Sequence, residues 1–415
     1  MSNITENISN IFKLNNHSMN ENKIILSGKI KQNDFRLKIK LSHYEIVELS
    51  YEINIKYNDY TKIFPDITFN NNKLKELTIN SNYVFSNCIL TSNIKKINIM
   101  SYYLKDLSST FVESIYSNYH IELFPKTIKI YILDLKKYEH ETDQNVLSNL
   151  PDFLESLYIK NDYSNINLNN LPKKLINFCY KCTITIPNID NLPTNIISIY
   201  LEGKDILGDL SNLPSSIKDL VIKLENYDDK IKNLLDNLPN LIESLDVKFN
   251  NNNKKNKLFT LNQNIKILKL DFGNKFNDNE LINKMPKNIE ELYLYNSIHQ
   301  DITFNNILEL KNLKILRLPE NIKFLIIFED IKKIGLKKLI VPNNLNIIFD
   351  YNLNIIKNNN LKKKDIFINN KKIIIDDIEI IYYYNYSHDY LIDKKNNQNL
   401  YFNHPVKELK YFNLF

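Results

Sequence analysis

The hydrophobic positions in the middle of the chain follow a pattern that repeats about every 21 residues. The phrase Asn-Leu-Pro recurs with its prolines at Pro151, Pro172, Pro193 and Pro214, so three successive steps are each 21 residues long. Apolar residues follow each proline at the third, sixth and eighth positions. Self-similarity at a fixed short period is typical of repeat proteins. The pattern therefore predicts an array of stacked copies of one short unit.

The same spacing continues on both sides of these four units. Its central apolar residues stand at 77, 97, 131, 157, 178, 199, 220, 245, 268, 292, 316 and 339. Most steps are 20 to 26 residues, but the step from 97 to 131 is 34 residues long. That step is too long for one plain repeat, and we expect it to hold an inserted or irregular unit around Val112 and Ile115.

The spacing inside one unit indicates its local structure. The last two apolar positions are two residues apart, so on a β-strand both side chains point to the same face. A unit of about 21 residues has room for one short strand, a turn and a return segment, but hardly for a full α-helix. Single units cannot bury their apolar side alone, so copies stack with their strands in parallel. We predict a strand-dominated α/β solenoid with a parallel concave sheet and few helices, the best helical candidate being residues 278–284 with Asp278 as N-cap.

At this point the sequence resembles the leucine-rich-repeat family, across roughly residues 61–345. Its L-P-x-x-L/I-x-x-L-x-I unit is similar to the short repeats of giant amoebal viruses and social amoebae, including the FNIP type, and to the LPX-type repeats of bacterial effector ligases. The chain departs from both groups, because the Phe-Asn-x-Pro element is absent and no segment resembling the effectors' catalytic cysteine domain follows the array. The composition, rich in Asn, Lys and Ile, favours the virus and amoeba group and an AT-rich genome.

The resemblance implies a role in binding other proteins. Some proteins with this repeat carry an N-terminal F-box, so a substrate-recognition subunit or effector in ubiquitin transfer is the alternative function. An F-box is helical, whereas residues 1–60 are rich in Asn and then strand-like.

Many family members also place Asn at the ninth position of the unit, where its side chain bonds the neighbouring turn. Asn82, Asn250, Asn321 and Asn344 occupy that position here.

The two flanks of the array are predicted to be β-rich. We divide the chain into an N-terminal polar segment and cap at 1–60, the solenoid at 61–350, and a C-terminal cap or small appended element at 351–415. In the first segment, apolar stretches on either side of a turn at 32–34 indicate β-hairpins. In the last segment, the apolar stretches 373–375 and 378–384 have strand character. A cap is the expected role of each flank, because an end repeat would otherwise expose its core.

Glycine content and charge remove several classes of function. Only five glycines occur, and no Gly-x-Gly-x-x-Gly loop that could cradle a phosphate is present. The net charge of +6 comes from 54 basic and 48 acidic residues, so the surface is of mixed sign and nucleic-acid binding is not expected. The densest basic run, Lys362 to Lys364, is interpreted as a solvated loop.

Cysteine usage and the N-terminus indicate a soluble intracellular protein, in the cytoplasm of the host if the source is a virus. The three cysteines are too few for a disulfide framework, and Met1 to Asn22 lacks the apolar stretch of a signal peptide. Cys179 and Cys182 form a lone C-x-x-C across a repeat strand, with Cys179 expected to face outward beside the core residue Phe178. We expect no metal, no cofactor and no catalytic centre, because no nucleophile, base and orienting residue can be combined from the sequence.

The outward side of the predicted concave sheet is the candidate binding site. Residues between the buried positions of each strand project outward, and they include tyrosines and charged residues of the kind found in protein interfaces. The candidate site residues are Tyr158, Tyr200, Asp246, Lys269, Tyr293, Tyr295 and Arg317. An alternative for two of them is mutual neutralisation, since Asp246 and Lys269 stand one unit apart. The sequence thus predicts a non-enzymatic scaffold that binds a partner protein through the concave face.

Overall fold

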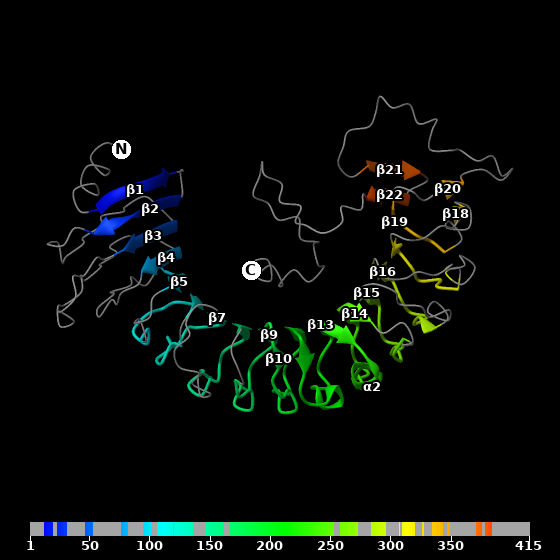
Figure 1. Ribbon diagram of the computed structural model, residues 1–415, viewed down its shortest axis with the longest axis horizontal. Helices are drawn as coiled ribbons and strands as arrows, with labels where there is room; N and C mark the ends of the chain where they lie inside the picture. The colour runs from blue at the N-terminus through cyan, green and yellow to red at the C-terminus, as the bar shows by residue number, and fades with distance from the viewer. Residues whose placement is uncertain are drawn as a thin grey trace, which may run out of the picture.

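The computed structural model describes residues 94–100, 106–118, 120–135, 147–161, 166–252, 258–272, 284–295, 309–319 and 334–342, together with Ile307 and the strands outside these ranges. Within these residues, 18 strands form one sheet. The strands stack along a curved array with the sheet on its inner side and the connecting turns on its outer side (Figure 1). The molecule is a strand-dominated parallel β-solenoid, as predicted.

The main sheet follows the order of the sequence except at its last two strands. It begins with β1 (Phe12–Met19), β2 (Lys23–Ile30), β3 (Ile46–Glu52), β4 (Glu76–Ser81), β5 (Lys96–Met100) and β6 (Ser114–Ser117). It continues with β7 (Ile130–Asp134), β8 (Ser156–Lys160), β9 (Asn177–Lys181), β11 (Ser198–Gly203), β13 (Asp219–Tyr227) and β14 (Ser244–Asn252). It ends with β15 (Ile267–Asp271), β16 (Glu291–Leu294), β17 (Ile315–Arg317), β19 (Lys338–Pro342), β22 (Ile378–Tyr383) and β21 (Lys371–Ile375).

Smaller elements lie between these strands. Two short parallel pairs join β10 (Thr185–Ile186) to β12 (Asp205–Ile206) and β18 (Ile326–Ile327) to β20 (Ile347–Ile348). A 3₁₀ turn, η1, spans Leu210–Asn212, and the α-helix α2 spans Asp229–Asp236. Apart from the helical residue Ile307, α2 is the single α-helix in the described residues. No helix in the described part of the chain is both long and apolar enough to cross a bilayer.

Each unit folds as its spacing predicts. The N–H of the third residue after the proline donates to the proline carbonyl, at 3.0 Å for Leu154 and Pro151 and at 3.1 Å for Leu175 and Pro172. This bond closes a tight turn immediately before the strand, a position where the missing N–H of proline costs no ladder bond. The sixth and eighth residues then point inward, and Leu157 is fully buried.

One continuous core runs through the described part of the array. Most of its members are the leucines and isoleucines of the repeat, and each contributes about 2 kcal/mol when its side chain leaves water. The units from β13 to β15 add an interior stack of aromatic rings. The ring centres of Tyr227 and Phe249 are 4.9 Å apart, and those of Phe249 and Phe272 are 5.6 Å apart.

The long step between residues 97 and 131 contains one additional unit. Its strand is β6, in which Ile115 pairs with Ile97 on one side and with Tyr131 on the other. Val112 and Ile115 are both fully buried. The predicted extra unit is therefore confirmed, and it is a regular member of the stack.

The helix prediction falls elsewhere than the observed helix. Residues 278–283 lie outside the described residues, and the helix that the structure shows is α2. Its N-cap is Asp228, whose side chain accepts the Ile231 N–H at 2.9 Å. Ile231 and Leu235 pack into the core, because residues four apart share one helix face. This unit is four residues longer than 21, and the additional length accommodates the helix.

The two flanks contribute hairpins to the same sheet. β1 and β2 pair antiparallel, and β2 then pairs in parallel with β3, so the predicted strand character of this region is confirmed. The hairpin predicted across residues 32–34 lies outside the described residues. At the other end, β21 and β22 form an antiparallel hairpin, and β22 pairs in parallel with β19. An antiparallel strand thus forms each edge of the sheet.

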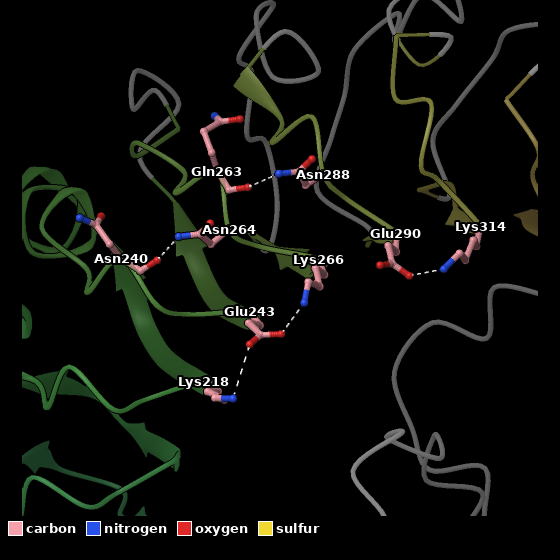
Figure 2. Close-up of polar contacts among 9 residues, drawn as sticks. All are labelled: Lys218, Asn240, Glu243, Gln263, Asn264, Lys266, Asn288, Glu290 and Lys314. Carbon is pink, nitrogen blue, oxygen red and sulfur yellow. Dashed lines mark hydrogen bonds and ion pairs between the residues drawn. The ribbon is translucent and has the colours of Figure 1, made fainter.

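Asparagine side chains link neighbouring units at positions other than the ninth of the unit. Asn250 is exposed on β14, and the other three ninth-position residues lie outside the described residues. The asparagine of Asn-Leu-Pro bonds instead to the unit before it, as Asn191 does with Asn169 at 3.0 Å. A second series lies two residues after the proline position, where Asn264 donates to the Asn240 carbonyl at 2.7 Å (Figure 2). These bonds explain why asparagine recurs with the period of the repeat.

Candidate functional site

A column of side chains runs along the middle of the concave face. Strand register places Tyr158 next to Cys179, and Cys179 next to Tyr200. The column then continues in register through Val221, Asp246, Lys269, Tyr293, Arg317 and Ile340. Six of the seven predicted site residues therefore occupy consecutive or nearly consecutive positions of one line, and Tyr295 stands in the neighbouring column.

The first part of this column is apolar and covered. Ile132, Tyr158 and Cys179 form a small cluster of their own on the concave side, against which Tyr116 and Tyr200 pack. Tyr158 is only 2% exposed. Its side chain lies apart from the main core, and neighbouring strands about 4.8 Å apart bring side chains close enough to cover it. Tyr158 thus supports the surface rather than offering its own ring.

Tyr200 is held in place by charged neighbours. Its hydroxyl donates to the Glu202 carboxylate in a close contact, and Lys223 Nζ lies 5.0 Å from the centre of its ring. Lys181 approaches Glu202 from the other side at 2.7 Å. Burial alone would raise the pKa of Glu202, but the hydrogen bonds from Lys181 and Tyr200 outweigh it and the pKa lies below its ordinary value. Glu202 is therefore ionised and fixes the tyrosine.

Asp246 and Lys269 form the ionic part of the column. The two charged groups are 4.0 Å apart, and the Lys269 residue is 9% exposed. Burial raises the pKa of Asp246 and lowers the pKa of Lys269, because it disfavours both charges, and the mutual attraction opposes both changes. The neutralisation considered from the sequence is thus present in the structure.

The last part of the column carries aromatic rings with cations above them. Lys269 Nζ lies 5.3 Å from the centre of the Tyr293 ring, and the Arg317 guanidinium carbon lies 4.5 Å from that of Tyr295. The Tyr293 hydroxyl donates to Glu291 at 2.9 Å. Burial raises the pKa of Tyr295 to about 12, although the Arg317 charge acts in the opposite direction. These rings are half-buried, and each lies against a cationic side chain.

Sequence reasoning missed residues that belong to the same face. Ile132 and Tyr116 continue the column upstream, and the Tyr116 hydroxyl donates to Asp134 at 3.2 Å. Lys181 completes the contacts of Glu202. The sequence does contain a signal for Tyr116. Once Ile115 is taken as the central apolar residue of the extra unit at β6, the next residue, Tyr116, falls in the same column as Ile132.

The C-x-x-C pair does not form one site. Cys179 belongs to the concave cluster, whereas Cys182 belongs to the interior core and its thiol contacts the Ile184 carbonyl at 3.1 Å. Burial, followed by the Glu202 charge, raises the pKa of the Cys179 thiol, so this thiol keeps its proton. In the described ranges, no group of three or more His, Cys, Asp or Glu side chains is arranged to hold a metal ion.

Comparisons with protein-family models and with curated proteins find no match to this chain.

Proposed function

We propose that this chain binds a partner protein without catalysing a reaction, and that the contact surface is the concave face between β11 and β17. Tyr200, Tyr293 and Tyr295 would provide the main contacts, with Asp246 and Arg317 setting the charge pattern around them. Tyrosine and arginine are the residue types that most often dominate the energy of protein interfaces.

The observation that carries this proposal is the fixed geometry of the half-buried tyrosines. Tyr200 is held by Glu202 and Lys223, and Tyr295 lies beneath Arg317. Side chains that are already ordered lose little conformational entropy when a partner docks, so more of the contact energy appears as affinity. The alternating charges around them would select a partner surface of complementary pattern.

We further propose that the array belongs to the short-repeat group of leucine-rich-repeat proteins, and that it acts in the cytoplasm. The L-P-x-x-L/I-x-x-L-x-I unit supports the first point, together with its single short strand per unit. The low cysteine content supports the second, and the two described cysteines are free thiols.

The test is affinity purification of the tagged full chain from its native setting, followed by measurement of the captured partner's affinity. If these three tyrosines are hot spots that each cost about 1 kcal/mol or more when truncated, changing Tyr200, Tyr293 and Tyr295 to Ala should reduce that affinity about a hundredfold. The matched control changes Leu207 and Lys230 to Ala, in the turn after β12 and in α2.

The outcome of this comparison is decisive provided both variants are folded, which circular dichroism establishes. Loss of binding in the tyrosine variant with retention in the control supports the concave face. Equal binding by the two variants would show that the partner docks elsewhere and would refute the proposal.

A further inference from the structure

A second column of residues lies at the N-terminal ends of the main-sheet strands from β5 to β19. It contains the residue immediately before each of these strands, and we call it the rim column. Its members are Lys95, Glu113, Lys129, Glu155, Ile176, Ile197, Lys218, Glu243, Lys266, Glu290, Lys314 and Lys337. Each backbone N–H donates to the carbonyl of the member before it, at 2.8 Å from Lys129 to Glu113 and at 2.9 Å from Ile197 to Ile176. The order of the column is therefore fixed by the sheet.

The rim column alternates in charge on both sides of an apolar centre. From Lys95 to Glu155 the signs alternate, and from Lys218 to Glu290 they alternate again in the same phase. Neighbours of opposite sign pair along the column, as Lys266 and Glu243 do at 2.7 Å and Lys95 and Glu113 do at 2.6 Å (Figure 2 shows the part from Lys218 onward). Ile176 and Ile197 interrupt the alternation, and Ile197 is exposed.

The charge pattern of the rim column is complementary to the same pattern running in the opposite direction. A two-fold axis between Ile176 and Ile197 makes each isoleucine face the other in a second copy. The same axis brings Glu155 opposite Lys218, and the next three pairs outward are also of opposite sign: Lys129 with Glu243, Glu113 with Lys266, and Lys95 with Glu290. Lys314 and Lys337 lie beyond this self-complementary stretch. In an isologous interface residue i contacts j and j contacts i, so each pairing occurs twice.

Exposed apolar side chains lie two residues before several members of the rim column, and the same axis brings them close to one another. Among the six large apolar side chains exposed in the described residues, Phe111, Phe153 and Leu241 stand at this position, at 54%, 36% and 56% exposure. The axis places Leu241 of the second copy opposite Thr127, which is the residue between Phe111 and Phe153 in this series. Each Leu241 would thus insert between two phenylalanines of the other copy.

We propose that two copies of this chain associate along the rim column, as a two-fold symmetric dimer with the isoleucines at its centre. Ten positions at about 4.8 Å give a strip roughly 43 Å long. The apolar series lies two residues away along the chain, a distance of about 7 Å, and widens this strip. The concave face stays free in this arrangement, so the dimer does not depend on the proposed function.

The test is sedimentation equilibrium of the full chain and of two single charge reversals. Wild type should dimerise. Glu155→Lys creates two Lys–Lys contacts across the axis, and Lys218→Glu creates two Glu–Glu contacts, so each variant alone should dimerise at least about tenfold more weakly. Mixed in equal amounts, the two variants restore Lys–Glu pairing at both contacts, and a heterodimer of wild-type affinity should form.

A matched control separates this effect from a general effect of charge. Lys204→Glu reverses an exposed lysine after β11, away from the rim column, and should dimerise as wild type does. Thermal unfolding checks that all variants are folded. The proposal is overturned if wild type is monomeric at 50 µM of chain, if either single variant dimerises as tightly as wild type, or if the mixture forms no heterodimer.

Discussion

Asp246 and Lys269 illustrate the desolvation free energy that charged groups on the concave face require. Their groups are 4.0 Å apart with little solvent around them, so the attraction between them offsets their desolvation only in part. Burial raises the folded-state pKa of Asp246 above its ordinary value of 3.8. The folded chain therefore binds this proton more tightly than the unfolded chain does. The resulting stability is complete below about pH 3.8 and is lost as pH rises through the folded pKa.

Removing one partner of this pair should destabilise the chain at neutral pH. We expect Lys269→Met to lower the free energy of unfolding by about 2 kcal/mol at pH 7, because the Asp246 charge stays partly buried without compensation. The loss should shrink towards pH 3.5, where Asp246 is protonated. Urea unfolding at the two pH values measures both quantities.

Asp246→Val combined with Lys269→Met serves as the control for this experiment. The double variant continues the apolar Val221 along the column and removes both desolvated charges, so its stability should lie within about 1 kcal/mol of wild type. A double variant that is less stable than Lys269→Met alone would contradict this account of the pair.

At the residue scale, the sequence predicts which residues line up in the concave column, but it does not predict how far each of their side chains is exposed. Alternation along a strand determines that Tyr200, Asp246 and Tyr293 share one line, because the register follows from the buried leucines. The burial of Tyr158 depends on side chains from the adjacent strands, whose sizes and conformations no periodicity encodes. For the same reason, the sequence did not reveal that Lys269 and Arg317 lie above tyrosine rings.

At the scale of elements, repeat length determines where a helix can form. The step from Ile199 to Leu220 is 21 residues, whereas the step from Leu220 to Leu245 is 25 residues and contains α2. The helical signal was present in the spacing of Ile231, Leu234 and Leu235 and in the capping Asp228. The period of the repeat alone does not locate this helix, because the four-residue excess can be accommodated anywhere between Leu220 and Leu245.

The cap at Asp228 should contribute measurably to the stability of α2. Asp228→Ala removes the acceptor for the Ile231 N–H and should cost about 1 kcal/mol. Hydrogen exchange of the amides in Asp229–Asp236 should become about fivefold faster, since helix opening is local. Asp228→Asn keeps an acceptor oxygen and should exchange nearly as wild type. Unchanged exchange in the alanine variant would mean that packing alone holds the helix.

At the scale of the whole molecule, each unit contacts mainly the units before and after it, so stability is close to a sum over neighbours. Deleting residues 173–193 joins Pro172 directly to Thr194 and leaves every remaining unit in register. We expect this shortened chain to fold, with a Tm lower by no more than about 5 °C.

A deletion that breaks the period is the matched comparison. Deleting residues 173–183 removes about half a unit, shifts the leucines out of the core and should prevent cooperative unfolding of the array. Circular dichroism during heating distinguishes the two chains. Equal behaviour of both deletions would show that the repeat period does not govern the fold.

The hairpins β1–β2 and β21–β22 also have a mechanical consequence. Tension applied between the two ends acts first on these terminal strands, and the interior strands carry load only after a hairpin has separated. Because each unit is bonded mainly to its neighbours, the array would then yield one unit at a time, each releasing roughly 70 Å of chain. Such a molecule would extend in many small steps under tension, and its units would refold one after another when the tension is released.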